Sequence, residues 1–193
     1  MNLIDMRTIV RRDLKDEDSS QRFTDDDLDR AITRAVGELS KYRPLEETAL
    51  ITTVSGSFDV NISALANRKS VSKVEFPIGE TPRRYTRFAV YGDTLTLLDL
   101  QGDGTDCRVY YGAPHTLDDE DSTIPPHLED LVALGATAYA ALVLSQYATD
   151  KANYGGENVD RDYLYWARGR LMEFEKGLKL LKKNLRVNLL YTD

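Results

Sequence analysis

The chain has 193 residues, of which 41% are hydrophobic and 30% are charged, and its net charge is −7. These proportions are typical of a folded globular protein and exclude a disordered chain, which would be poorer in apolar residues. A single cysteine, Cys107, excludes an internal disulfide and a cysteine-based zinc cluster. The first residues show no signal-peptide pattern and no stretch approaches a membrane span, so we expect a cytoplasmic protein with no membrane partner.

Two amphipathic helices are predicted at the start of the chain. Apolar residues recur at helical spacing on one face of the first: Leu3, Met6, Val10 and Leu14. This pattern predicts a helix over residues 3–14. Thr24, followed three residues later by Asp27, forms a variant of the capping box and marks the start of a second helix. That helix is expected to end at Pro44.

The middle of the chain changes to the alternating pattern of short β-strands, rich in β-branched and aromatic residues. Six strands are expected, at residues 48–54, 58–62, 71–78, 85–91, 94–98 and 106–111. Turns that contain glycine separate most of them. Because such close turns leave no room for the helical crossovers of a parallel sheet, we expect an antiparallel sandwich or barrel-like module.

Two long helices are predicted after the strands. Pro126 suits the first position of a helix over residues 126–149, which is apolar on almost every side and must therefore be buried. In the last helix apolar residues alternate steps of three and four: Leu164, Ala167, Leu171, Phe174, Leu178, Leu181 and Leu185. We expect this seam to pack on the preceding helix of the same chain rather than in an intermolecular coiled coil.

Charge is divided unevenly along the chain. Between Arg161 and Arg186 there are eight basic and three acidic residues, although the whole chain is acidic. The last helix is therefore predicted to be a positive element on a negative body. Its basic face leaves DNA binding open as a function, although proteins that bind DNA usually carry an overall basic excess.

Few residues suggest catalysis. His115 and His127 each lie near a proline beside an acidic segment, and we expect both to be surface loop residues. The carboxylates of residues 99–106 could coordinate calcium, but their spacing fails the EF-hand pattern and a hairpin turn explains them better. Cys107 is expected to be a packed small hydrophobe. We therefore expect no enzyme activity, no catalytic residue, no cofactor and no metal.

Two blocks near the start resemble tailed-phage head-to-tail connector proteins, also called adaptor or head-completion proteins. Residues 6–16 match the pattern R..V..DL.D, and residues 22–32 contain an aromatic followed by T-D-D-x-L. The later elements follow in the family's order: a β insert, an Ile-Pro pair before an alanine-rich helix, and a long helix with Trp166 and Phe174. The resemblance covers most of the chain, and the order of the elements carries it.

The fold expected from the residues and the resemblance together is α+β. Residues 1–46 form an N-terminal helical pair, and residues 118–186 form a C-terminal pair of two long helices that completes the bundle. Residues 47–117 form the inserted antiparallel β module. Residues 187–193 form a docking tail.

The resemblance implies a structural subunit of the virion neck, made in the cytoplasm of the bacterial host. Such adaptors form a ring, commonly dodecameric, beneath the portal, and DNA passes through its centre without sequence-specific binding. The implied partners are other copies of the chain, the portal protein and a further neck or tail-completion protein. In these adaptors the C-terminal helix or tail docks on the portal. The resemblance carries this role to Lys182, Lys183, Arg186, Val187, Leu189, Leu190 and Tyr191.

Two other classes of function remain open from the sequence. The first is a DNA-binding phage packaging or regulatory protein, which would use the basic face with Lys179, Lys182 and Lys183. The second is a small metal-dependent enzyme, in which calcium or magnesium would depend on Asp103 and Asp106.

Overall fold

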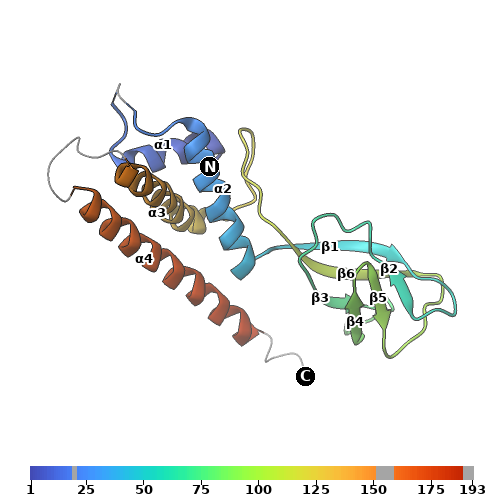
Figure 1. The fold of residues 1–193 in the computed structure, drawn as a ribbon. Coiled ribbons are helices and arrows are strands. Elements are labelled where there is room, and N and C mark those ends of the chain that lie inside the picture. Colours follow the sequence, from blue (N-terminus) through green and yellow to red (C-terminus); the bar gives the residue numbers. More distant parts are fainter. Residues whose placement is uncertain (19–20, 151–158, 189–193) are drawn as a thin grey trace. The chain divides into compact units, whose positions relative to one another are not determined.

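The computed structural model describes residues 1–18, 21–150 and 159–188, with side chains described up to residue 145 of the third helix and over residues 163–181 of the fourth. The helices are α1 (Leu3–Leu14), α2 (Asp25–Tyr42), α3 (Pro126–Asp150) and α4 (Val159–Asn188) (Figure 1). The strands are β1 (Leu45–Thr52), β2 (Asp59–Asn61), β3 (Ser70–Glu75), β4 (Phe88–Tyr91), β5 (Thr94–Leu97) and β6 (Asp106–Ala113). The predicted α+β class is confirmed.

The chain divides into two compact units. A helical unit contains residues 1–43 together with the chain from residue 115 onward, and a β unit contains Pro44–Pro114. The β module expected at residues 47–117 therefore begins and ends three residues earlier in the structure. At its start the strand pairing begins directly after Pro44, where Leu45 pairs with Ala113. The first residues of β1 were not predicted to be a strand, because the charged pair Glu46 and Glu47 interrupts the alternation of apolar and polar residues.

Capping boxes fix the starts of the first two helices. The Thr24 side chain accepts a hydrogen bond from the backbone N–H of Asp27, whose carboxylate accepts one from the backbone of Thr24. This cap was predicted. The same arrangement joins Asn2 and Asp5 at the start of α1 and was not predicted, although the bounds of that helix were. Caps of this kind stabilise a helix by about 1 kcal/mol.

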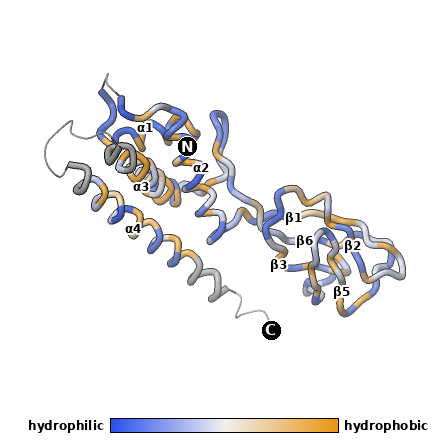
Figure 2. The backbone as a smooth tube through the Cα atoms, viewed as in Figure 1, coloured by the Kyte–Doolittle hydropathy of each residue, from blue (hydrophilic) through white to orange (hydrophobic). Residues whose placement is uncertain are grey.

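The core of the helical unit combines elements from both ends of the chain. Helix α3 contacts α1, α2 and α4, and it is coloured as the most hydrophobic of the four helices in Figure 2. Phe174 of α4 lies so close to Gly135 of α3 that a Cβ atom on the glycine would be 2.7 Å from the phenyl ring. In the same way, a Cβ atom on Gly177 of α4 would lie 2.6 Å from Cδ1 of Leu131 in α3. The predicted packing of the last helix on the preceding one is therefore confirmed.

One expectation about α3 was wrong. Residues Pro126–Ser145 are long and apolar enough to cross a membrane, with a mean hydropathy of 1.5, so the chain does contain a stretch that approaches a membrane span. In the structure 61% of that window is buried inside the protein. The apolar composition of this helix is explained by its place at the centre of the helical core.

The β unit is built from two antiparallel sheets of three strands each. Their strand orders are β1-β6-β3 and β2-β5-β4. Residues from both sheets form its core, which consists of Val60, Ile62, Leu65, Val74, Phe76, Leu95, Leu97, Cys107 and Val109. On β6 the buried residues Cys107 and Val109 alternate with Arg108 and Tyr110, which are only partly buried. One face of this sheet therefore covers the core and the other carries polar and aromatic side chains.

Candidate functional site

The residues predicted to bind the portal lie at the C-terminal end of α4 and beyond it. They are Lys182, Lys183, Arg186, Val187, Leu189, Leu190 and Tyr191. The first four belong to the last turns of α4, but their side chains lie outside the described residues. The last three lie outside the described residues altogether. Their role in docking stays a prediction.

The described part of α4 carries exposed charges of both signs. Arg168, Lys176 and Lys179 are exposed. Arg170 lies 3.7 Å from Glu173, and Lys179 lies 4.0 Å from the Glu175 carboxylate. Ion pairs as exposed as these contribute little to stability, so the same side chains remain available to a partner.

A buried carboxylate organises the outward face of the β unit. Glu75 is only 1% exposed, yet it lies on the polar face of its sheet. Its Oε2 accepts hydrogen bonds from the Tyr110 hydroxyl at 2.9 Å and from Nη1 of Arg108 at 3.2 Å. Arg83 covers this pair, because its Nη1 donates to the Tyr110 hydroxyl oxygen at 3.2 Å.

Aromatic side chains complete this network. The ring of Tyr85 meets that of Tyr110 edge to face, with ring centroids 6.2 Å apart, and Lys73 Nζ lies 5.3 Å from the Tyr85 centroid. Each polar group of the network thus has a hydrogen-bond or ring partner within it. These contacts attach the segment between β3 and β4 to the sheet. The sequence analysis did not single out Glu75. The available signal was a glutamate inside a strand otherwise rich in valine, where a buried charge requires partners.

Glu75 should make the stability of the β unit depend on pH. Burial is the largest single effect and raises the pKa of Glu75. The hydrogen bond from Tyr110, the charge of Arg108 and smaller effects of the same sign together outweigh burial, so this pKa lies below its ordinary value of 4.5. A carboxyl whose pKa falls on folding stabilises the folded state above its unfolded pKa, and that contribution is lost as the pH falls through the folded pKa. We expect Glu75→Gln to lower the free energy of unfolding at neutral pH. As the pH falls below about 4.5, the free energy of unfolding should decrease less in Glu75→Gln than in the parent.

The measurement is the free energy of unfolding by urea at a series of pH values from neutral to acid. Glu80→Gln is the matched control, because Glu80 is an exposed glutamate of the same segment. The control should keep the parent's pH profile. Equal acid sensitivity in the parent and in Glu75→Gln would contradict the assigned role.

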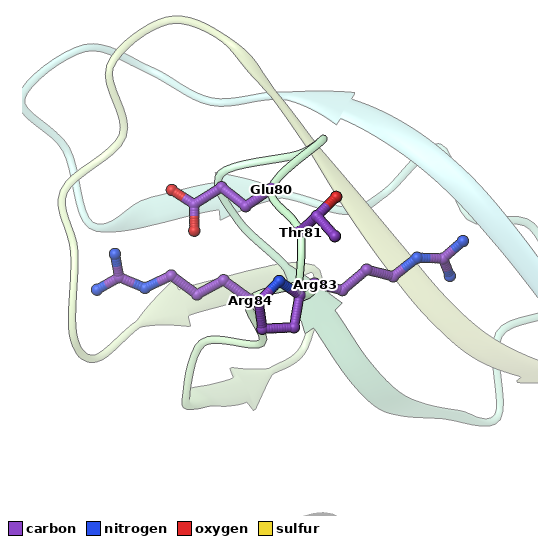
Figure 3. Close-up of a pocket in the computed structure, with 5 residues that line it drawn as sticks. Glu80, Thr81, Arg83 and Arg84 are labelled. Carbon is purple, nitrogen blue, oxygen red and sulfur yellow. The ribbon is translucent and has the colours of Figure 1, made fainter.

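A shallow pocket lies at the loop between β3 and β4. It is lined by Glu80, Thr81, Pro82, Arg83 and Arg84. Glu80 and Arg84 extend to one side of the loop and Arg83 to the other (Figure 3). All the lining residues come from one short segment, so no side chains from different elements converge there as they do in a binding cavity.

The two histidines differ, and the prediction for one of them was wrong. His127 is exposed, as expected, but it lies in the first turn of α3 and not in a loop. His115 is only 6% exposed and is not a surface loop residue. Its Nδ1 lies 2.9 Å from the carbonyl oxygen of Thr123 and its Nε2 lies 3.1 Å from that of Arg43. The ring therefore joins the end of α2 to the segment before α3. The sequence prediction rested on the neighbouring proline, which gives no information about partners so far away along the chain.

The acidic segment 99–106 behaves as a turn. Asp99 accepts hydrogen bonds from Arg87, Asp103 from Thr105, and Asp106 from Thr52. Each carboxylate is thus turned toward a different partner. Over the described residues, no three His, Cys, Asp or Glu side chains come together as ligands for a metal ion.

Cys107 lies in the core of the β unit, where it is fully buried. Burial raises the pKa of its thiol, which favours the neutral, unreactive form. The predicted role as a packed small hydrophobe agrees with this position.

No model of a protein family matches the chain, and no curated protein matches it significantly.

Proposed function

We propose that this chain is a structural subunit of a tailed-bacteriophage neck. In this role, copies of the chain form a ring under the portal, DNA passes through the ring, and a further neck or tail-completion protein binds below. The virion neck would be its location after synthesis in the host cytoplasm. Assembly, rather than catalysis, would be its activity.

The arrangement of the elements is the observation that carries this proposal. Helices from both ends of the chain close one core, and the β unit is inserted between α2 and α3. This order is the one that the resemblance to head-to-tail connectors implies. A subunit of a ring contacts neighbours through two different surfaces and also contacts the components above and below. Two independently built units on one chain supply such separate surfaces.

The distribution of charge supports the same role. Exposed carboxylates occur in the first turn of α2, at Asp25, Asp26 and Asp27, and in the loop of residues 118–121. The described part of α4 adds exposed cations. Opposite charges on one molecule favour contacts between unlike surfaces of neighbouring copies. An acidic lumen would also repel the DNA phosphates and keep DNA from adhering during passage.

The experiment is to measure the mass of the purified chain alone and mixed with the portal protein of the same phage. The expected result is a complex that contains one portal ring and a ring of copies of this chain. A chain that remains separate from the portal at all mixing ratios would overturn the proposal.

Removal of residues 187–193 should abolish portal binding and leave the fold intact. The apolar residues of this segment would supply the docking contact, whereas the described core lies elsewhere. Binding is measured by co-sedimentation with the portal, and folding by circular dichroism and thermal melting. Leu50→Ala, at an exposed apolar position of β1, is a control that should bind normally. Normal portal binding by the shortened chain would contradict the predicted docking role.

DNA binding for packaging or regulation is the second candidate, because Arg168, Lys176 and Lys179 are exposed on one helix. This function would give a salt-dependent affinity for duplex DNA that is lost when Lys179, Lys182 and Lys183 are changed to Glu. A neck subunit would instead show only weak affinity for DNA at physiological salt, in the parent and in this variant alike.

A further inference from the structure

Strand β1 lies at the edge of its sheet and has one open side. Within the described part of the chain, β6 is the strand that pairs with it (Figure 1). The backbone N–H of Thr53, directly after β1, donates to the carbonyl oxygen of Thr105 at 2.9 Å, so the odd-numbered residues of β1 direct their N–H and C=O groups at β6. The backbone groups of the even-numbered residues Thr48, Leu50 and Thr52 therefore point away from the sheet. No other described segment pairs with them.

This open edge lacks the features that usually prevent edge strands from pairing, which are charges, prolines, bulges and short length. Strand β1 has eight residues, pairs with β6 without a register shift, and carries neither charge nor proline over residues 48–52. The opposite edge of the same sheet differs, because β3 has a register shift between Val71 and Lys73 and is bridged by Tyr85. Regularly spaced backbone donors and acceptors are matched by another extended strand. The chemistry of this edge therefore specifies a β-strand as its partner.

The sequence of β1 indicates which strand fits. From Thr48 to Thr52 it reads T-A-L-I-T, which is nearly the same in both directions. When two copies pair antiparallel with Leu50 opposite its own equivalent, residues at equal distances on either side of Leu50 face each other. Thr48 then faces Thr52 of the other copy, and Ala49 faces Ile51. Pairs of threonines and pairs of apolar residues both stabilise antiparallel strands.

The same register brings the open backbone groups together. Its facing residues on the outer side of the sheet are Thr48, Leu50 and Thr52, whose N–H and C=O groups point toward the open edge. Each of these pairs can therefore exchange two N–H···O bonds. A shift by one residue would put the backbone groups out of phase, and a shift by two would place Leu50 opposite a threonine.

The charges of β1 are compatible with this register. Glu46 and Glu47 are its charged residues. They would face Val54 and Thr53 of the other copy, so neither carboxylate meets another carboxylate of β1. Like charges directly opposite each other would destabilise such a pair of strands.

We propose that two copies of this chain associate edge to edge through β1, with the strands antiparallel and Leu50 at the two-fold axis. The contact joins two three-stranded sheets into one continuous sheet. The same short segment is used twice, as in other isologous contacts. The association goes beyond the proposed function and does not depend on it, because a two-fold contact closes on itself and cannot build a ring.

The first test is sedimentation equilibrium of the full chain from about 1 to about 100 μM, a range suited to a contact of micromolar affinity. The expected result is a reversible monomer–dimer equilibrium. Leu50→Lys should weaken the dimer by at least about tenfold, because two ammonium groups would meet at the axis. Val90→Lys is the matched control, since Val90 is an exposed apolar residue of β4, an edge strand of the other sheet. A monomeric parent, or a dimer weakened by Val90→Lys and not by Leu50→Lys, would overturn the proposal.

Amide hydrogen exchange followed by NMR gives a residue-by-residue test. The N–H groups of Thr48, Leu50 and Thr52 should be protected at high protein concentration and exchange rapidly at low concentration. Those of Ala49 and Ile51, which point toward β6, should be protected at both. Rapid exchange at Thr48, Leu50 and Thr52 in a sample that is dimeric by sedimentation would show that the contact lies elsewhere.

Cross-linking tests the direction and register of the strands. Leu50→Cys should form a disulfide between copies when oxidised glutathione is added, because facing Cα atoms of a hydrogen-bonded pair are about 5.5 Å apart. Thr48→Cys is the control and should not, since the two copies of residue 48 would lie about 13 Å apart along the strands. The native Cys107 is buried and does not interfere. Cross-linking at both positions would indicate parallel strands, and a dimer without cross-linking at residue 50 would exclude the register, so either result overturns the proposed geometry.

Portal binding is measured on the same parent sample. Absence of the dimer with normal portal binding refutes only the β1 contact, and a dimer that ignores the portal refutes only the neck function.

Discussion

Replacing Phe174 by alanine is expected to destabilise the helical unit by about 3–5 kcal/mol. The Phe174 side chain is fully buried between α4 and α3. Its ring contacts the backbone side of Gly135 and meets Tyr139 edge to face, with centroids 6.1 Å apart. Alanine would leave a cavity at this point, and the glycine has no side chain that could move to fill it.

The measurement for Phe174→Ala is urea unfolding followed by the helical circular dichroism signal. Met172→Ala is the control on the same helix, because Met172 is 71% exposed and its removal creates no cavity. A loss below about 1 kcal/mol for Phe174→Ala would show that α4 is not held by the packing described.

Asp16→Ala should cost about 3 kcal/mol, the second largest effect that we expect. The Asp16 side chain is 2% exposed. Its carboxylate accepts hydrogen bonds from the backbone N–H groups of Arg22 and Phe23 at 2.7 and 3.2 Å, and from Arg11 Nη1 at 3.0 Å. Alanine would leave these donors without their acceptor beneath the connection from α1 to α2.

Asp16→Asn and Asp13→Ala test this explanation of Asp16. Asparagine keeps one acceptor oxygen and should lose less stability than alanine. Asp13 is exposed on the last turn of α1, so its removal should change the free energy of unfolding by less than about 0.5 kcal/mol. Equal losses for Asp16→Ala and Asp13→Ala would exclude the buried carboxylate as an organising group.

The helices were predictable because the signals for each one, its apolar spacing and its capping residues, lie within or next to the helix itself. Residues 3–14 carry a regular apolar stripe, and Thr24 with Asp27 marks a helix start by its own hydrogen bonds. The seam containing Phe174 identified the face of α4 that packs on α3. The six strands were also expected, since turns that contain glycine separate most of them, although their ends differ by a few residues.

The side-chain networks were not predictable, because their partners are distant in the sequence. His115 depends on Arg43, and Glu75 depends on Tyr110. Neither spacing follows a helical or strand period, so only the folded chain brings the groups together.

The helical core closes only when both ends of the chain exist, and this affects how the protein is made. On the ribosome, α1 and α2 emerge first, but the Phe174 side chain that completes their shared core follows about 130 residues later. At typical translation rates this delay is on the order of ten seconds. The β unit lies entirely within that interval and can fold while the first two helices wait. During synthesis, therefore, the apolar sides of α1 and α2 are open to chaperones until α3 and the part of α4 around Phe174 have emerged.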